Sequence, residues 1–575
     1  MMKMRRIGRG RARLLYGVTL AGLALALVQG CSRRAGDGQA ANGAGGYPAP
    51  RFLVSLLNPT QDDLVRAARI AVRQTHGMSP LGKIETGQTV HVVLPFSQDM
   101  AVWEALKQAW AERGVTAVAV RPWEVTGEDA GAYAALARAN VTHGDEAWKE
   151  IGNFDTVYYP YFSPDIQKEL GDLKWAERGK VYHKALKPYL EKHPEIRWFM
   201  SDAGGGPNWL SVALGDKLME RFAGNWTYIT RASLISKGSE YPGDLWNMVE
   251  DKLIAPIEHV SEGTFTDPQG TDLHWVITPE QARKWKQYVA LVNNHMFLYP
   301  QPMETLRFEG KVSGTANHTG FYPQMTVHLS DHGRVIKVEG GGRTGDMFRL
   351  LVDNPRLAGV QFPSTPVKGY WYLAADGFAT NPKKARDMDT LIAGSTELPN
   401  IFERERAGVI HLSFSSGAGN YDIPLATIEA AIRQGRKTLG PKSADVRDLL
   451  YAAQHKIPMG HTAHIHNYFG TMKWKLRDTG EWITRSEKGR IKAFDDPEVR
   501  ALAARYGDPD TIFSYDWIPA IPGINVPGNY QTYARDPWSW VVNEYKQIKD
   551  GSYPYLVRNY DLLRTSADGQ GARKK

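Results

Sequence analysis

An apolar run, an amphipathic run and a second apolar run follow one another early in the chain. The stretch TVHVVLPF is short and β-branched, MAVWEALKQAWAERG places apolar residues at helical spacing, and VTAVAVRPW is again typical of a strand. Two neighbouring parallel strands require a crossover segment, usually a helix, so this order predicts a β-α-β unit. Similar runs continue further along, and we expect residues 51–255 to form an α/β domain with a mainly parallel sheet.

The region 256–480 changes to an alternation of apolar and polar residues. The stretch MTVHLSDHGRVIKVEGG predicts two antiparallel strands joined by a tight turn at DHG. We therefore expect an α+β, mostly antiparallel domain here. Residues 481–575 are rich in proline, glycine and aromatic residues, and we expect this C-terminal extension to consist of long ordered loops over a surface.

The first thirty residues have the composition of an export signal. A basic segment, MMKMRRIGRGRAR, precedes LLYGVTLAGLALALV, an apolar segment too short for a mature membrane-spanning helix. Cys31, the one cysteine of the chain, follows in VQGCS and resembles the lipidated cysteine of bacterial lipoproteins. We expect residues 1–30 to be a signal peptide and 31–50 to be a lipidated cysteine with a flexible tether. The alternative is a generic signal peptide with an incidental cysteine.

The charge distribution argues against a nucleic-acid partner. The net charge is +8, but six basic residues and no acidic residue lie in the first thirty positions, so the remainder is close to neutral. Ser32 stands after Cys31, where an aspartate would signal inner-membrane retention. We therefore expect a lipoprotein of the bacterial cell envelope, anchored to the outer membrane and facing the periplasm.

Histidines gather in the stretch PMGHTAHIHNYFG. In a strand, residues two apart point to the same face, so His464 and His466 can bind one metal ion together while Ile465 packs into the core. His411 lies in another strand-like stretch, GVIHLSFSSG. Imidazole nitrogen is a preferred ligand of zinc and related divalent ions. His461 falls outside this alternation, and we expect it to orient a ligand through a hydrogen bond.

Two further stretches offer carboxylate ligands. Glu304 lies in PQPMETLRF, and Glu339 precedes three glycines in GRVIKVEGGG. Each candidate also has a purely structural interpretation. Glu304 could pair with Arg307, and Glu339 could be a solvated charge at a turn. His411 could be a hydrogen-bonded core residue, and histidine pairs on strands commonly face water.

The region 260–470 resembles the aminopeptidase T family of metallopeptidases in the order of its motifs. These are GTDL in QGTDLHW, a glutamate after a proline-containing loop in PQPMET, the hairpin GRVIKVEGG, the strand VIHLSFSSG, and HIH in place of a final His-x-Asp. The preceding α/β domain also fits the family's N-terminal domain. The resemblance implies a two-metal site with Glu304, His411, His464 and His466 among its ligands.

The resemblance leaves the second carboxylate open. The family places a glutamate just before a glycine-rich turn that ends in Asn-Pro, and in AADGFATNP the acidic residue, Asp376, is offset by one position. Glu339 is its rival. Tyr421 lies ten residues beyond His411, roughly where these peptidases have a catalytic tyrosine that could stabilise a developing oxyanion.

The separation of His411 from His464 is wider than in the peptidases and closer to that of the similar 2,5-dihydroxypyridine dioxygenases. Those enzymes cleave an aromatic ring with one iron held by His and His-x-Asp. His466 replaces the aspartate, which removes a negative charge and changes the metal preference. This second resemblance implies a mononuclear non-haem iron dioxygenase that acts on a small hydroxylated aromatic through His411, His464 and His466.

We expect the first of these functions, a metal-dependent hydrolase of the aminopeptidase type that acts on a small peptide. Two zinc, cobalt or manganese ions, bridged by Glu339 or Asp376, would lower the pKa of a shared water. One iron(II) is the cofactor of the alternative dioxygenase. A third interpretation is a non-catalytic lipoprotein that binds a ligand in the same fold. Resemblance to the peptidases also implies that the chain can form a homodimer.

Overall fold

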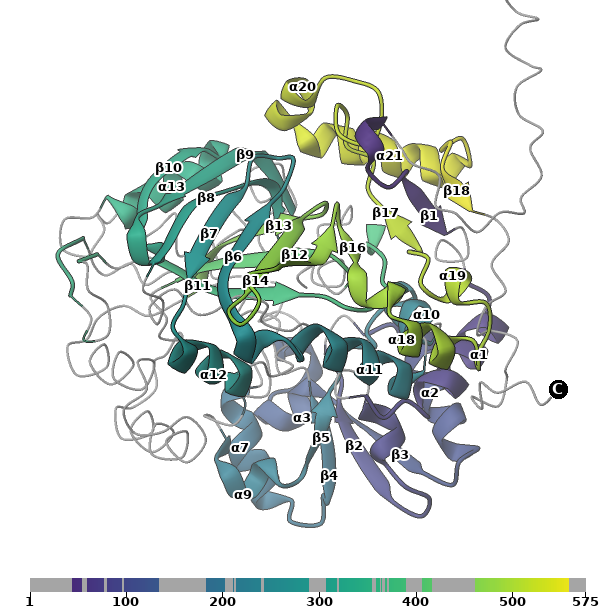
Figure 1. The fold of residues 1–575 in the computed structure, drawn as a ribbon. Helices are drawn as coiled ribbons and strands as arrows, with labels where there is room; N and C mark the ends of the chain where they lie inside the picture. The colour runs from purple at the N-terminus through teal and green to yellow at the C-terminus, as the bar shows by residue number, and fades with distance from the viewer. Residues whose placement is uncertain are drawn as a thin grey trace, which may run out of the picture. The chain divides into compact units, whose positions relative to one another are not determined.

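Four β-sheets organise the part of the chain that the structure, a computed structural model, describes (Figure 1). The described residues are 44–53, 59–76, 80–95, 98–133, 183–201, 210, 214–238, 242–288, 307–317, 320–353, 358–361, 363, 368–369, 372–388, 406–415 and 461–557. One sheet is parallel and the largest is antiparallel, so the chain has the mixed α/β content that its sequence predicts.

The parallel sheet has the strand order β3-β2-β4-β5. Its strands are β2 (Thr89–Val93), β3 (Thr116–Val120), β4 (Trp198–Ser201) and β5 (Phe222–Asn225). The predicted β-α-β unit is confirmed, because β2 and β3 pair in parallel and α2 (Met100–Ala111) connects them. The side chain of Asp99 accepts a hydrogen bond from the backbone N–H of Ala101 and so caps the first turn of α2.

Apolar side chains pack on both faces of this sheet, as expected for parallel strands. Val92 belongs to the main apolar cluster, together with residues of α1 and α2, whereas Val93 belongs to a second cluster with residues of α7. The α-helices of this region, besides α2, are α1 (Gln61–Ala71), α3 (Pro122–Thr126), α7 (His183–Lys192), α9 (Asp216–Met219), α10 (Arg231–Gly238) and α11 (Gly243–Ile254).

The antiparallel sheet has the strand order β10-β9-β8-β7-β6-β14-β15-β16. Its strands are β6 (Val260–Thr266), β7 (Asp272–Val276), β8 (Arg307–Asn317), β9 (Gly320–Leu329), β10 (Val335–Gly340), β14 (Thr471–Leu476), β15 (Trp482–Glu487) and β16 (Arg490–Ile491). The predicted DHG hairpin joins β9 to β10, and His332 and Gly333 adopt the left-handed backbone that such a turn needs. Two helices accompany this sheet, α12 (Pro279–Tyr288) and α13 (Gly342–Val352).

A separate three-stranded sheet carries the histidine stretch. It consists of β11 (Tyr372–Phe378), β12 (Ile410–Ser415) and β13 (His461–Asn467), all antiparallel. Strand β13 packs against β8 of the large sheet. The approach is close, because a Cβ atom added at Gly314 of β8 would lie 2.5 Å from Cγ2 of Ile465.

Helices occupy much of the C-terminal region where the sequence led us to expect loops. They are α18 (Pro497–Ala503), α19 (Pro509–Ile512), α20 (Tyr530–Arg535) and α21 (Pro537–Asp550). Three of the four begin with Asp-Pro, in which the aspartate side chain caps the helix and the proline takes the first helical position. Proline is favourable there because that position lacks an intrahelical N–H partner anyway, so these prolines start helices rather than break them.

A short strand from the beginning of the chain pairs with two strands from its end. Strand β1 (Arg51–Leu53) lies between β17 (Trp517–Ile518), with which it is antiparallel, and β18 (Leu556–Val557), with which it is parallel (Figure 1). The first residues of the predicted 51–255 domain therefore share a sheet with the C-terminal extension. The 3-10 helices are η1 (Ala44–Gly46), η3 (Pro80–Lys83), η5 (Ile257–His259), η7 (Asp331–Gly333) and η9 (Lys492–Asp495).

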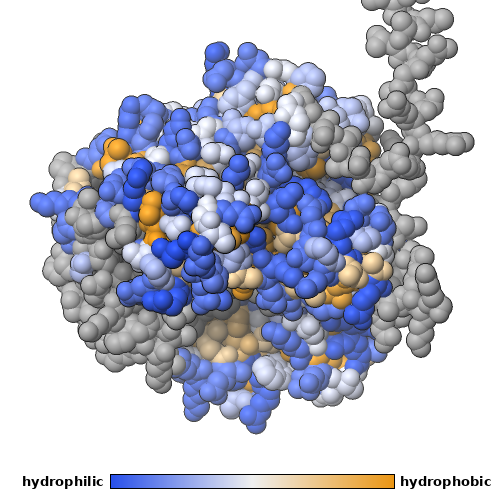
Figure 2. All heavy atoms as spheres, in the orientation of Figure 1, coloured by the Kyte–Doolittle hydropathy of each residue, from blue (hydrophilic) through white to orange (hydrophobic). Residues whose placement is uncertain are grey.

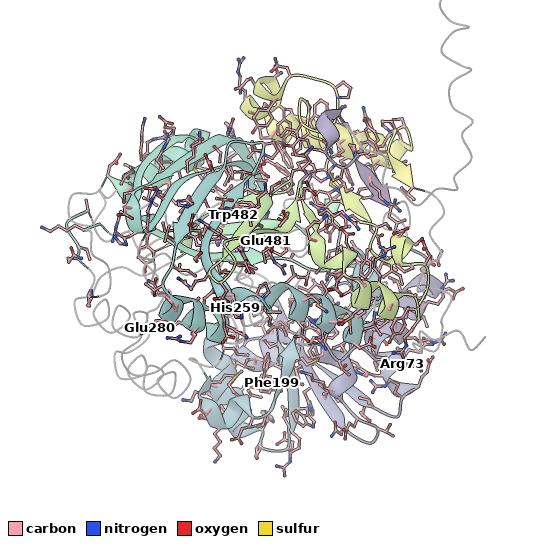
Figure 3. The ribbon with its side chains drawn as sticks, in the orientation of Figure 1. Arg73, Phe199, His259, Glu280, Glu481 and Trp482 are labelled. Atoms are coloured by element: carbon pink, nitrogen blue, oxygen red, sulfur yellow. The ribbon has the colours of Figure 1, made fainter. Side chains whose placement is uncertain are left out.

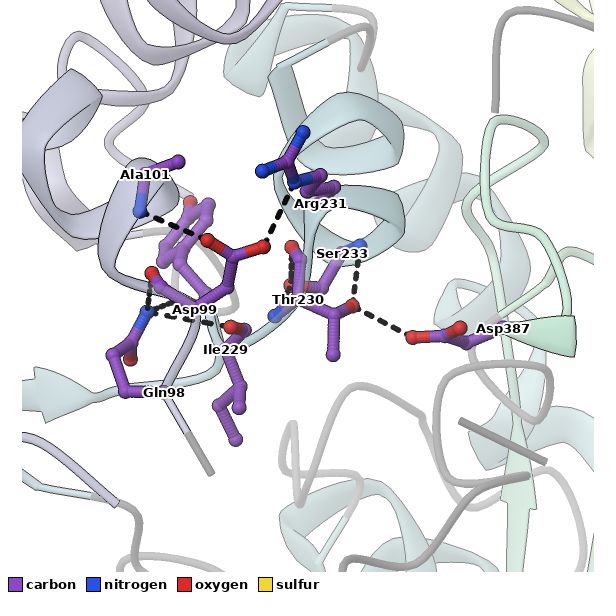
Figure 4. A network of polar contacts seen from close by, with 9 residues as sticks. Gln98, Asp99, Ala101, Ile229, Thr230, Arg231, Ser233 and Asp387 are labelled. Carbon is purple, nitrogen blue, oxygen red and sulfur yellow. Dashed lines mark hydrogen bonds and ion pairs between the residues drawn. The ribbon is translucent and has the colours of Figure 1, made fainter. Parts of the chain in front are cut away.

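A polar network ties the parallel-sheet region to the segment that follows β11 (Figure 4). The hydroxyl of Thr230, at the start of α10, donates to Oδ2 of Asp387 at 2.7 Å. On the next residue, Nε of Arg231 donates to Oδ2 of Asp99 at 2.8 Å. Asp387 is almost fully buried, so this contact holds the segment after β11 against the ends of two helices.

Most of the apolar core is continuous, and the surface is largely hydrophilic. One cluster of buried residues runs from β1 and α1 through the antiparallel sheet to α21. The face in Figure 2 is mostly hydrophilic, with apolar residues in smaller separate areas. In the ranges that the structure covers, no helix is both long enough and apolar enough to cross a membrane.

Candidate functional site

The register of β12 and β13 brings three histidines onto one face of the small sheet. His411 pairs with His466, and Ser413 pairs with His464. Directly opposed residues of antiparallel strands point to the same side, and residues two apart along a strand do so as well. His411, His464 and His466 therefore project from one face, while Ile465 is fully buried on the other.

The three imidazoles lie next to each other in the interior. The ring centroids of His411 and His464 are 4.7 Å apart and nearly stacked, with an interplanar angle of 22°. The rings of His411 and His466 are 5.8 Å apart and almost perpendicular, at 79°. All three side chains are at least 95% buried, so this is an internal cluster rather than a wet strand face.

Small residues adjoin the histidines on the same sheet. On β11, Gly377 pairs with His411, and on β12, Ser413 separates His411 from the end of the strand and pairs with His464. Ser413 is fully buried. The three imidazole rings are therefore the largest side chains among these neighbouring positions on this face of the sheet.

The side chain of Tyr322 on β9 and the backbone of β8 make hydrogen bonds to β13, and the sequence analysis did not single these contacts out. The hydroxyl of Tyr322 donates to the backbone carbonyl of His464 at 3.0 Å. Asn467, directly after His466, donates through Nδ2 to the carbonyl oxygen of Ser313 at 2.9 Å. Burial raises the pKa of Tyr322 well above its ordinary value, so its hydroxyl stays protonated and remains a donor.

The GTDL motif forms part of the same support. Thr271 lies in the turn between β6 and β7, and its hydroxyl is 3.0 Å from the carbonyl oxygen of Ser313 and 3.3 Å from Oδ1 of Asn467. The backbone N–H of Ser313 donates back to the same hydroxyl oxygen at 2.9 Å. The motif that suggested the family resemblance thus contacts the residue that follows the histidine strand.

Glu339 lies on a different sheet from the three histidines. It sits on β10, the edge strand of the large sheet, and 47% of its side chain is exposed. Its carboxylate pairs with Lys337 and accepts a hydrogen bond from Nε2 of His328 at 2.7 Å. These two partners lower the pKa of Glu339 to about 2. Its setting is that of a solvated surface charge with two partners of its own, and its role as a ligand or bridging carboxylate stays a prediction.

The structure says less about the other predicted residues. The backbone of Asp376 pairs with Leu412, one position away from the pairing of Gly377 with His411, and its side chain is outside the described part. The backbone of His461 begins β13, and its side chain is likewise not described. Glu304, Tyr421 and the lipidation residue Cys31 lie outside the described residues altogether.

The other described histidines have carboxylate partners elsewhere or lie singly on other elements. His259 is exposed (Figure 3), and its Nδ1 is 2.7 Å from Oδ2 of Asp478. His193 pairs with Glu195 in the same way at 2.8 Å. His76 is buried, but it stacks on Trp246 and its Nε2 is 3.0 Å from Oε2 of Glu250. The three histidines of β12 and β13 differ from these pairs because they lie next to one another.

The histidines suit a divalent metal ion by donor type, though not by their present ring orientation. Three imidazole nitrogens are a known ligand set of catalytic zinc, which leaves a position open for water or substrate. Within the described ranges, however, no three His, Cys, Asp or Glu side chains are arranged so that they could hold a metal ion. Two of the rings are stacked, so they would have to turn about their side-chain torsions to face one point.

No protein-family model matches this chain, and no curated protein does. Among solved structures, AmpT from Thermus thermophilus is similar over 75% of this chain and 99% of its own, with a TM-score of 0.34 and 13% identity. The 2,5-dihydroxypyridine dioxygenase from Pseudomonas putida KT2440 is similar over 77% and 100%, with a TM-score of 0.35 and 11% identity. Similarity this distant does not decide between their functions.

Proposed function

We propose that this protein is a metal-dependent enzyme in which His411, His464 and His466 bind one divalent ion. The observation that carries the proposal is the register of β12 and β13, which sets three buried imidazoles on one face of a sheet. Three adjacent imidazoles supply three nitrogen donors of the type that zinc and related divalent ions prefer.

Hydrolysis of a small peptide, as by an exopeptidase, is the reaction that we propose. A divalent ion held by these three imidazoles would supply Lewis acidity and would lower the pKa of a bound water to about 7. In this proposal Glu304 completes the ligand set, as the family resemblance implies, and the hydroxyl of Tyr421 donates a hydrogen bond to the developing oxyanion. Because the carboxylate of Glu339 is engaged with Lys337 and His328 on another sheet, this proposal uses one ion rather than two bridged ions.

Ring cleavage of a hydroxylated aromatic by one iron(II) is the second candidate. The same observation favours it, because a single ion on three ligands from neighbouring strands matches a mononuclear oxygenase better than a carboxylate-bridged pair. The usual set for such iron is two histidines and one carboxylate, and this chain has a third histidine instead. Metal identity therefore separates the two reactions.

Elemental analysis of the tag-free protein tests the proposal. We expect the parent to retain zinc, cobalt or manganese, and His411→Ala, His464→Ala and His466→Ala each to lose most of it. His259→Ala is the matched control, because it removes an exposed histidine whose partner is Asp478. Circular dichroism checks that the variants remain folded.

The same measurement distinguishes the two reactions. Zinc, cobalt or manganese together with release of amino-terminal residues from short peptides supports the hydrolase. Iron together with oxygen-dependent loss of a hydroxylated aromatic supports the dioxygenase. If all three variants and the parent carry the same metal content, His411, His464 and His466 do not form a metal site and both functions fall.

A further inference from the structure

Strand β13 has a ladder neighbour on one side only within the described sheets. It is an edge strand in the order β11-β12-β13, and its register partners all come from β12. Its other side packs on β8, which belongs to the large antiparallel sheet. The outer edge of β13 has no paired strand within the described sheets. The contacts between β13 and β8 therefore help to fix the position of the histidines.

The hydroxyl of Tyr322 bridges the two strands at the first histidine of the pair. It lies 3.0 Å from the carbonyl oxygen of His464 on β13 and 3.2 Å from that of Ala316 on β8. Tyr322 is 1% exposed, so its hydroxyl is shielded from bulk solvent. One hydroxyl thus couples the backbone of His464 to the neighbouring sheet.

The side chain of Asn467 makes the second bridge, at the other end of the pair. Its Nδ2 donates to the carbonyl oxygen of Ser313 on β8, and its Oδ1 faces the hydroxyl of Thr271. Asn467 is fully buried, and Thr271 and Ser313 are each 2% exposed. Buried hydrogen bonds of this kind are hard to exchange for water, so they fix a geometry more firmly than exposed ones.

We propose that Tyr322 and Asn467 are positioning residues that set the placement of His464 and His466 for metal binding. The inference rests on the proposed function, in which this row holds a divalent ion. The two bridges bracket the His-Ile-His segment, one at the carbonyl of His464 and one just after His466. Neither residue belongs to the ligand set, because Tyr322 acts through a backbone carbonyl and Asn467 pairs with Ser313 on the face opposite the imidazoles.

The test compares two tyrosine variants of the full-length protein. Tyr322→Phe removes the bridging hydroxyl and keeps the ring. Tyr533→Phe is the control, since it removes another buried hydroxyl, which lies 3.3 Å from the hydroxyl of Thr315 on the same strand β8. We expect Tyr322→Phe to weaken cobalt(II) binding by about 10–100-fold, as is typical when a group that orients a ligand is lost. Tyr533→Phe should bind cobalt(II) as the parent does, and the two variants should lose similar amounts of thermal stability.

Hydrogen exchange of the amides of β13 provides a measurement that needs no metal. We expect faster exchange in Tyr322→Phe and in Asn467→Ala than in Tyr533→Phe. If β13 exchanges equally in all of them, the bridges do not position the strand and the inference is overturned. If the parent binds no cobalt(II), the proposed function fails, while the exchange measurement still decides whether Tyr322 and Asn467 hold β13. Equal cobalt(II) affinity in the parent and Tyr322→Phe would show that the hydrogen bond of Tyr322 does not affect metal binding by His464 and His466.

Discussion

At the scale of single residues, Asp267 is the described carboxylate whose environment changes its pKa most clearly upward. It is buried in the turn before GTDL, and its two oxygens accept hydrogen bonds from the backbone N–H groups of Gln269 and Phe469 at 2.9 and 3.0 Å. Burial raises its pKa to about 6, although these bonds favour the charged form. Asp267 thus joins the β6–β7 turn to the residues that follow the histidine strand.

The raised pKa of Asp267 predicts a definite pH dependence of stability. Between pH 3.8, the ordinary pKa, and about 6, the folded state binds more protons at this carboxyl than the unfolded state does. The free energy of unfolding contributed by Asp267 therefore falls as pH rises through that window and is constant above it. A shift of about two pKa units corresponds to roughly 3 kcal/mol.

Asp267→Asn removes this titration, and urea unfolding at several pH values measures it. We expect the parent to lose stability relative to the variant between about pH 4 and pH 6, and the difference to remain constant above that window. The asparagine keeps one acceptor and turns its amide group toward a backbone N–H. The variant therefore also has a loss in the free energy of unfolding that does not depend on pH. Parallel pH profiles for the two proteins would contradict the assignment of the raised pKa to Asp267.

At the scale of elements, the contact of β8 with β13 depends on a glycine. Gly314 allows Ile465 to pack directly on the backbone of β8, since an added Cβ atom would stand 2.5 Å from Cγ2 of the isoleucine and 3.4 Å from the carbonyl oxygen of His466. Ile465 is fully buried and cannot move outward. The two sheets can therefore approach this closely because Gly314 has no side chain.

Gly314→Ala should destabilise the fold by about 1–3 kcal/mol, the usual range for an overpacked core. Ile465→Ala alone should cost about 2–5 kcal/mol through the cavity that it leaves. In the double variant the two changes offset each other, so its loss should be smaller than the sum of the single losses. Denaturant unfolding of the four proteins measures this coupling.

Gly131→Ala is a control, because its methyl group meets a side-chain oxygen of Asp129 on the surface. Strict additivity of the single losses would mean that β8 and β13 do not approach so closely.

At the scale of the whole molecule, the segment 379–388 contacts both the parallel-sheet region and the C-terminal region. Thr380 accepts a hydrogen bond from Trp246 of α11 at 2.7 Å, and Asp387 accepts one from Thr230, directly before α10, at 2.7 Å. Lys383 donates to the carbonyl oxygen of Ser514 at 2.7 Å, and the guanidinium of Arg386 lies 4.5 Å from the ring centre of Trp517. The parallel-sheet region and the C-terminal region are therefore joined through one buried segment.

This shared segment and the continuous apolar core predict one unfolding transition. The main cluster holds residues from β1, the parallel sheet, the antiparallel sheet and α21 together, so these regions share most of their core, while a smaller second cluster lies between the parallel sheet and α7. We expect a single calorimetric peak, with near-ultraviolet and far-ultraviolet circular dichroism changing at the same temperature. Two separated transitions would show that the predicted 51–255 and 256–480 domains unfold independently.

The cell-envelope location is a proposal that one variant tests. Lipidation at Cys31 would anchor the protein, since two acyl groups hold a chain on a membrane far more firmly than one. We expect the parent in the outer-membrane fraction and Cys31→Ala in the soluble fraction after cell lysis. Identical fractionation of the two proteins would argue for a generic signal peptide, or none.

Local patterns in the sequence determined the elements that depend on neighbours along the chain. The alternation of short apolar runs with a helical run specified the β-α-β unit, and DHG between alternating strands specified the β9–β10 hairpin, because periodicity and turn conformation are local properties. The spacing of His464 and His466 set them on one face of a strand for the same reason. Most of the C-terminal helices were also specified locally, by an Asp-Pro pair at the first turn. The high proline and glycine content of this region had suggested loops instead.

Only the tertiary structure decided which distant residues meet. The sequence could not tell that His411 pairs with His466, because strand register depends on the packing of whole sheets rather than on either strand. Nor could it place Glu339 on an exposed edge beside His328, set β1 between β17 and β18, or reveal that Tyr322 and Asn467 brace the histidine strand. These contacts join residues far apart in the chain, and their energies depend on burial and on partners that exist only once the fold has formed.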